Sequence, residues 1–171
     1  NYSEKIIYLS NSYQPNDEKK EISKIKTKKE DFGFPQYSKI LGCFNSTYKI
    51  TTEELEIWSR ILNKVENTYL WLIKTNDIAE KNLINFFKQR NINTNRIKFA
   101  ENIKHSKHLE RISHSDLFLD TFNYNAHTTC SDALWVGVPV ITKIGKQFSA
   151  RVASSLLNSL NLQELITINN N

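Results

Sequence analysis

The feature that most constrains the fold is a regular alternation of short apolar runs with amphipathic segments, from Lys39 to Asn161. The apolar runs have strand length, and the segments between them have helical spacing of their apolar residues. Strands that alternate with helices of about ten to fifteen residues predict βαβ crossovers and a parallel sheet. We therefore predict an α/β fold, a Rossmann-like lobe with a doubly wound parallel sheet covered on both faces. Its ligand should lie beyond the C-terminal ends of the strands.

The individual elements follow from this pattern. The expected strands are short and apolar, and they span Lys39–Asn45, Tyr69–Lys74, Arg96–Ala100, Leu117–Thr121 and Val138–Thr142. The expected helices are amphipathic, and they span residues 51–65, 77–91, 105–114, 128–137 and 148–161. Thr51 and Glu54 have the spacing of a capping box, and Gly137 predicts the end of the fourth helix.

The first 36 residues have a different character. Glu4–Ser10 is β-branched and apolar, which predicts a short strand. Asn11–Gln36 is polar, rich in lysine and interrupted by Pro and Gly, which predicts a linker with one helical turn in its middle. We therefore divide the chain into residues 1–36, an inter-lobe strand and linker, and residues 37–171, the Rossmann-like lobe. The chain starts with Asn and contains no Met, so we expect a piece of a longer protein, truncated at the C-terminus of the lobe.

Composition excludes several classes of protein. Two cysteines among 171 residues exclude a disulfide framework and favour a reducing compartment, which we take to be the cytoplasm. The apolar run Ala133–Ile141 is too short to span a membrane. The net charge of +5 owes much to Lys19–Lys29, which we interpret as a solvated charge run and not as a nucleic-acid surface. Steeply salt-dependent binding to any base sequence would be the sign of nucleic-acid binding.

The loops that follow the expected strands carry most of the chemistry. Their charged and imidazole side chains should gather at one edge of the sheet; they are Lys49, His105, His108, His127, Asp132, Lys143 and Arg151. Taken singly, the lysine and the first two histidines are more often solvated surface residues than functional ones. The histidines lack the spacing of a zinc site, so we predict no metal. Asp120 ends a strand and is a candidate for anchoring a loop.

The loop after the fourth strand is the most informative. Thr128 and Thr129 stand where a helix begins, and the unpaired N–H groups of a helix N-terminus suit a phosphate. His127, just before them, could donate to the same anion. The alternative is that one threonine is simply an N-cap and that Asp132 completes a capping box. Neither a dinucleotide fingerprint nor a P-loop is present.

These strings resemble a known family. LFLDTFNYNAHTTCSDALWVGVPVITKIGKQFSARVASSLLNSLNLQELIT, Leu117–Thr167, is similar to the C-terminal lobe of the O-linked N-acetylglucosamine transferases, glycosyltransferase family 41. LGCFNSTYKI and the opening YSEKIIYLSNSYQPND extend the resemblance over nearly the whole chain. It implies the C-terminal half of a GT-B glycosyltransferase that is inverting, independent of metal and specific for UDP-GlcNAc.

The resemblance also implies roles for individual residues. Lys49 would contact the β-phosphate and stabilise the leaving UDP as the catalytic residue, and Asp132 would bind the ribose hydroxyls. Uracil would stack on His108, with Arg111 beside it and the backbone of Ile103 at its edge. The pyrophosphate would be held by His127, Thr128 and Thr129. Two positions depart from the animal enzymes, because Ser46 replaces a glutamine near the phosphates and His105 replaces a lysine near the ribose.

The implied function is donor binding in a protein O-glycosyltransferase that acts on Ser and Thr. Acceptor proteins would bind through an N-terminal lobe and tetratricopeptide repeats that this chain lacks, so we expect no turnover by the chain alone. No cofactor, nucleic acid or membrane is expected. The alternatives are an N- or other glycosyltransferase with a different UDP-sugar, and a non-catalytic UDP-binding interaction module.

Overall fold

The computed structural model describes residues 3–168, and within them the strands form one parallel sheet in the order β3-β2-β1-β4-β5-β6. The strands are β1 Lys39–Cys43, β2 Thr68–Ile73, β3 Ile97–Ala100, β4 Leu117–Leu119, β5 Val140–Lys143 and β6 Ile166–Thr167. Strand β1 pairs with β2 on one side and with β4 on the other. The strand order therefore reverses between β1 and β4, and the predicted Rossmann-like fold class is confirmed.

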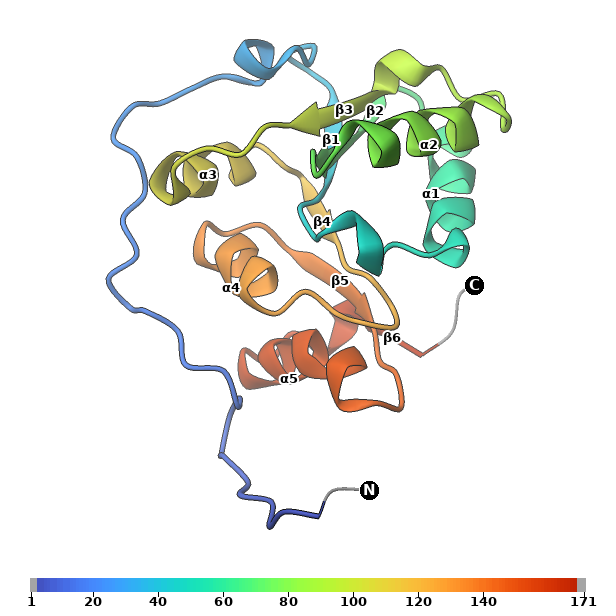
Figure 1. The fold of residues 1–171 in the computed structure, drawn as a ribbon. Helices are drawn as coiled ribbons and strands as arrows, with labels where there is room; N and C mark the ends of the chain where they lie inside the picture. The colour runs from blue at the N-terminus through green and yellow to red at the C-terminus, as the bar shows by residue number, and fades with distance from the viewer. Residues whose placement is uncertain (1–2, 169–171) are drawn as a thin grey trace.

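Helices cover both faces of this sheet (Figure 1). They are α1 Thr52–Lys64, α2 Asp77–Lys88, α3 His105–Ile112, α4 Thr128–Trp135 and α5 Val152–Ser159. Leu41 and Leu70 belong to the core that contains the buried side chains of α1 and α2. Ile40 and Trp71 belong to the second core, which contains buried side chains of α3, α4 and α5. Successive strand residues thus enter opposite layers, which explains why the strands are apolar without alternation.

Short 3₁₀ helices complete the secondary structure. They are η1 Lys29–Phe32, η2 Thr47–Lys49, η3 Thr94–Arg96, η4 Phe148–Ala150 and η5 Gln163–Leu165. Helix η1 lies near the C-terminal end of the predicted linker and not in its middle, where the helical turn was expected. Helix η4 occupies the first part of the predicted helix 148–161, so the α-helix itself begins only at Val152.

The predicted helix signals act as expected. The amide N–H of Thr51 donates to Glu54 Oε2 over 2.8 Å, which completes the capping box before α1. Gly137 follows α4 with φ of +80°, a left-handed conformation that glycine adopts without the steric cost of a Cβ atom. Local sequence therefore sets where these two helices begin and end.

The predicted strand at Glu4–Ser10 is wrong. The structure gives these residues no regular hydrogen-bonded structure and leaves them exposed. A strand needs a partner for its backbone groups, and the described lobe offers none at this position. Sequence analysis also missed β6, which has only two residues and is defined by its pairing with β5. Residues 1–2 and 169–171 of the two predicted segments lie outside the described residues, and the boundary at residue 36 stays a prediction.

The N-terminal segment runs along the outer side of α3, α4 and α5 before it enters the sheet (Figure 1). Its backbone and side chains contact these helices directly. The backbone N–H of Ser23 donates to the carbonyl of Ser106 over 3.0 Å. The hydroxyl of Thr27 donates to Glu110 Oε2 over 2.6 Å. The predicted linker is therefore attached to the lobe along its length.

Candidate nucleotide site at the sheet edge

The predicted site residues follow the C-terminal ends of β1, β3 and β4, which lie at one edge of the sheet. This edge includes the point between β1 and β4 where the strand order reverses. At such a point the loops after neighbouring strands diverge to opposite faces and leave a crevice for a ligand. The topology thus brings together loops that are about 80 residues apart in sequence, such as those of Lys49 and His127.

Lys49 contacts the loop after β4. Its Nζ donates to the carbonyl of Asn125 over 3.1 Å and lies 3.9 Å from the centroid of the Tyr124 ring. Burial lowers the pKa of Lys49, and the carboxylate of Asp120 opposes that lowering. The ammonium group therefore contacts Asn125, which precedes His127 by two positions and is close to the start of α4.

The start of α4 lacks the side-chain N-cap that the alternative interpretation predicted. The N-cap position is His127, and no side chain caps the helix there. The hydroxyl of Thr129 instead donates to Asn45 Oδ1 over 2.5 Å, while Asp132 pairs with residues outside the helix. The capping alternative for Thr128, Thr129 and Asp132 is therefore wrong. The first N–H groups of α4 have no side-chain cap, which is the arrangement that suits an anion.

Asp120 is the buried centre of this region, and sequence analysis considered it only as a loop anchor. Its Oδ1 accepts hydrogen bonds from the backbone of Thr121 and Ala126 and from Asn45 Nδ2. Its Oδ2 accepts from Thr142 Oγ1 over 2.6 Å. Asn45 in turn accepts from Thr129, so one network links the ends of β1, β4 and β5 to α4.

Burial raises the pKa of Asp120 to about 7, and the surrounding hydrogen-bond donors lower it by less than burial raises it. Burial likewise raises the pKa of Cys43 to about 12 and keeps Cys130 protonated. The two cysteines are free and buried, so neither is an activated nucleophile.

A second group of site residues lies on α3. Arg111 is 3% exposed; its Nε donates to His108 Nδ1 over 2.9 Å and its Nη1 donates to the carbonyl of Glu101 over 2.6 Å. The His108 ring packs edge-on against Phe44, with 5.1 Å between centroids. Burial and then the charge of Arg111 lower the pKa of His108 to about 4, so the ring is neutral at neutral pH. A neutral ring held on two sides is suited to stack on a planar heterocycle.

A third group joins α3 to α4. His105 Nε2 lies 2.9 Å from Asp132 Oδ2, and Lys20 Nζ lies 2.8 Å from Asp132 Oδ1. The side chain of Asp132 is 4% exposed and that of Lys20 is 9% exposed. The interpretation of Lys20 as part of a solvated charge run is therefore wrong, because its side chain is largely covered and pairs with the predicted site residue Asp132.

The remaining predicted site residues are Ser46 and Ile103. Ser46 is half-buried at the N-cap of η2, and its carbonyl accepts from the N–H of Lys49. Ile103 is 42% exposed in the loop before α3. Sequence analysis missed Tyr13 and Gln14, whose side chains contact His127 and Thr128. No sequence signal identifies them, because the contacts join residues 114 positions apart.

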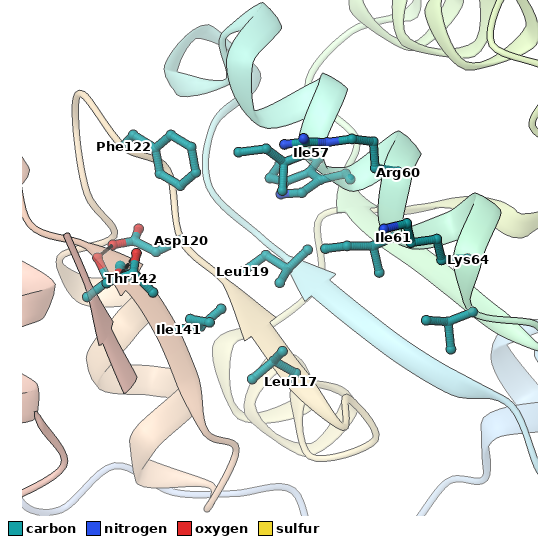
Figure 2. Close-up of a pocket in the computed structure, with 13 residues that line it drawn as sticks. Ile57, Arg60, Ile61, Lys64, Leu117, Leu119, Asp120, Phe122, Ile141 and Thr142 are labelled. Atoms are coloured by element: carbon teal, nitrogen blue, oxygen red, sulfur yellow. Dashed lines mark hydrogen bonds between the residues drawn. The ribbon is translucent and has the colours of Figure 1, made fainter. Parts of the chain in front are cut away.

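A hollow of about 440 Å³ lies elsewhere, between α1 and strands β4 and β5 (Figure 2). Its lining is largely apolar, with Ile57 and Ile61 on one side and Leu119 and Ile141 on the other. It shares Asp120 and Thr142 with the buried network but contains none of the predicted site residues. The hollow therefore touches the buried network of the sheet edge at Asp120 and Thr142 and lies away from the predicted donor residues.

Residues 3–168 contain no group of three or more His, Cys, Asp or Glu side chains that could hold a metal ion. None of the helices in that range is long and apolar enough to cross a membrane. Independence of metal stays a prediction.

Two curated proteins are similar to this chain. The probable UDP-N-acetylglucosamine–peptide N-acetylglucosaminyltransferase SEC of Arabidopsis thaliana is 34% identical over 173 residues, which cover 98% of this chain and 18% of that protein. A UDP-N-acetylglucosamine–peptide N-acetylglucosaminyltransferase of Caenorhabditis elegans is 31% identical over 144 residues, covering 84% of this chain and 12% of that protein. This chain thus spans less than a fifth of the length of either relative.

A solved structure and a family model give the same relationship. A variant of the Thermobaculum terrenum O-GlcNAc transferase superposes with a TM-score of 0.74 and 32% identity, over 78% of this chain and 26% of that one. The model of glycosyl transferase family 41 matches residues 7–171. Because that match covers almost the whole sequence, the chain belongs to glycosyl transferase family 41.

Proposed function

We propose that this chain is the donor-binding lobe of a protein O-glycosyltransferase that transfers N-acetylglucosamine from UDP-GlcNAc to Ser and Thr hydroxyls. The observation that carries the proposal is the meeting of Lys49 with the uncapped start of α4 at the point where the strand order reverses. Family membership and the names of the relatives support the same reaction. The cytoplasm remains the predicted compartment, in keeping with two unpaired cysteines.

The donor would lie along the sheet edge from α3 to α4. Uracil would stack on His108 next to Arg111, with its edge at the backbone of Ile103. The ribose hydroxyls would reach Asp132, beside His105. The diphosphate would lie over the start of α4; the residues around it are Ser46, Lys49, His127, Thr128 and Thr129.

This placement gives Lys49 and α4 a catalytic task. The acceptor oxygen attacks the anomeric carbon with inversion, and the bond from that carbon to the β-phosphate oxygen breaks. The electron pair stays on that oxygen, and the hydroxyl proton goes to a base outside this lobe. Negative charge thus increases on UDP in the transition state, where the ammonium of Lys49 and the helix N-terminus stabilise it most. Two such positive groups can replace a divalent cation, so we propose a reaction that needs no metal.

An NMR titration of this chain with UDP tests the proposal, with ADP as the control ligand. We expect UDP to shift resonances of His108 and of the first turn of α4, and the Lys49→Ala variant to bind UDP roughly tenfold more weakly. Lys146→Ala is the matched control, because this lysine is exposed and lies in another loop. No response to UDP from the folded protein would contradict the proposal.

Further measurements separate the alternatives. Tighter binding of UDP-glucose than of UDP-GlcNAc would favour a different UDP-sugar. In the full-length protein, UDP binding without transfer to peptides would favour the non-catalytic module. We expect the isolated chain to transfer no sugar, since the acceptor-side lobe would supply the base.

A further inference from the structure

The N-terminal segment contacts three of the predicted donor residues in succession. The Tyr13 hydroxyl lies 2.7 Å from His127 Nδ1, and Gln14 Nε2 donates to Thr128 Oγ1 over 2.9 Å. Lys20 Nζ then donates to Asp132 Oδ1 over 2.8 Å. A segment of eight residues thus covers the start and the first turn of α4, between the predicted diphosphate and ribose positions.

Tyr13 packs edge-on against Phe148, with 4.8 Å between ring centroids, and the contacts of Gln14 and Lys20 with α4 are polar. A hollow of about 420 Å³ separates it from α4 and α5 and is lined in part by Leu134, Trp135 and Leu160. The segment therefore does not rest on a continuous apolar surface there. The contacts to the site residues are consequently a main determinant of its position.

The pair of Lys20 and Asp132 has a specific consequence for charge. Both side chains are almost fully buried, and a buried carboxylate without a partner would be strongly unfavourable. Removal of Lys20 would leave His105 as the remaining partner of this carboxylate and would increase the net negative charge close to where the diphosphate is proposed to lie. That charge would repel the diphosphate of UDP but would act far less on a neutral nucleoside.

The same pair fixes the orientation of the carboxylate. Oδ1 accepts from Lys20 and Oδ2 contacts His105, so each oxygen keeps a lone pair free for another donor. In the proposed site, each free position would accept from one of the two adjacent ribose hydroxyls.

Tyr13 also contacts His127, with 2.7 Å between its hydroxyl and Nδ1. Burial raises the pKa of Tyr13 and lowers the pKa of His127, so the phenol and the imidazole are both neutral. In the tautomer that carries its proton on Nε2, Nδ1 accepts from the Tyr13 hydroxyl and Nε2–H is the group that an anion at the start of α4 would need.

We propose that the segment Tyr13–Lys20 is part of the donor site and that Lys20 is a positioning residue that orients Asp132 and balances its charge. This inference rests on the proposed function. The inference goes beyond the proposed function because it makes Lys20, a residue of the N-terminal segment, a determinant of specificity for a nucleoside diphosphate over the nucleoside.

Affinities of UDP and uridine for wild type and for Lys20→Met, measured by calorimetry or NMR, test the inference. Lys19→Met is the matched control, because it removes the same charge from an exposed neighbouring side chain. We expect Lys20→Met to weaken UDP binding roughly tenfold and uridine binding less than about threefold, while Lys19→Met changes both by less than about twofold. In an Asp132→Asn background, the effect of Lys20→Met on UDP should shrink, because the charge it balances is gone.

Each other outcome has a defined meaning. Equal losses for UDP and uridine would contradict the charge-balancing role, since a purely structural change weakens both. Tighter binding of UDP by Lys20→Met would overturn the inference, because the segment would then compete with the donor. The same affinities in Lys20→Met and Lys19→Met would also overturn it while leaving the proposed function intact. Failure of folded wild type to bind UDP would contradict both proposals.

Discussion

Asp120 gives the most direct test of how the candidate site is built. Its carboxylate accepts from four donors, three on Oδ1 and one on Oδ2. In Asp120→Asn the amide oxygen can keep the three donors of Oδ1. The amide N–H₂ can take the place of Oδ2 and donate to Thr142, whose hydroxyl both donates and accepts. The variant should therefore fold, with its network nearly intact.

The two proteins should differ in how stability depends on pH. The folded-state pKa of Asp120, about 7, lies above the ordinary value of 3.8. A raised pKa means that the stability from the protonated group is fully present below pH 3.8 and is lost as pH rises through about 7. Between about pH 5.5 and pH 8, this loss is about 2 kcal/mol from the linkage relation.

Urea unfolding of wild type and Asp120→Asn at a series of pH values measures this quantity. The difference in unfolding free energy between the two proteins should change by about 2 kcal/mol over that range, in favour of the variant at high pH. Taking the difference cancels the histidines, which titrate in the same range in both proteins. A difference that stays constant with pH would refute the reasoning and show that Asp120 is ionised throughout.

Asp120→Ala serves as the harsher comparison. It removes the acceptor for buried donors of Thr121, Ala126 and Asn45, and orphaned buried donors cost about 1–3 kcal/mol each. We expect a loss of roughly 3–5 kcal/mol, enough to threaten folding of a domain of ordinary stability. A loss below about 1 kcal/mol would mean that water replaces the carboxylate.

Three further predictions concern single residues. Thr129→Val keeps the shape of the side chain but leaves Asn45 Oδ1 without its donor, so the free energy of unfolding in urea should fall by about 1–2 kcal/mol and UDP should bind more weakly. An unchanged free energy of unfolding would show that this hydrogen bond does not form in solution. The pKa of His108 is lowered to about 4, so its stabilising contribution is present above about pH 6.5 and lost as pH falls toward 4. An NMR titration should therefore find the ring neutral at about pH 5.5. A titration midpoint near pH 6.5 would contradict the burial of the ring. Gly137→Ala should cost about 1–2 kcal/mol through its φ of +80° alone, since open space surrounds the added Cβ, and an unchanged unfolding midpoint would refute this.

The sequence by itself determined the order and type of the elements in the lobe. Strand and helix periodicity are properties of neighbouring residues, as are the capping box of Thr51 and Glu54 and the terminating Gly137. Because parallel strands place their following loops at one edge, the same pattern also predicted which loops gather there. Lys49 and the first turn of α4 were among the residues predicted at that edge, and their roles in donor binding stay predictions.

Only the tertiary structure decided how these groups are held. The strand expected at Glu4–Ser10 does not form, because backbone groups need a partner that no local pattern supplies. The Thr129 hydroxyl donates to Asn45 and does not cap its own helix. Lys20, although it belongs to a lysine-rich run, pairs with the carboxylate of Asp132, 112 residues away. Burial and pairing of polar groups depend on the whole packed chain, since a residue's charge and hydrogen bonds are determined by whatever the fold places beside it.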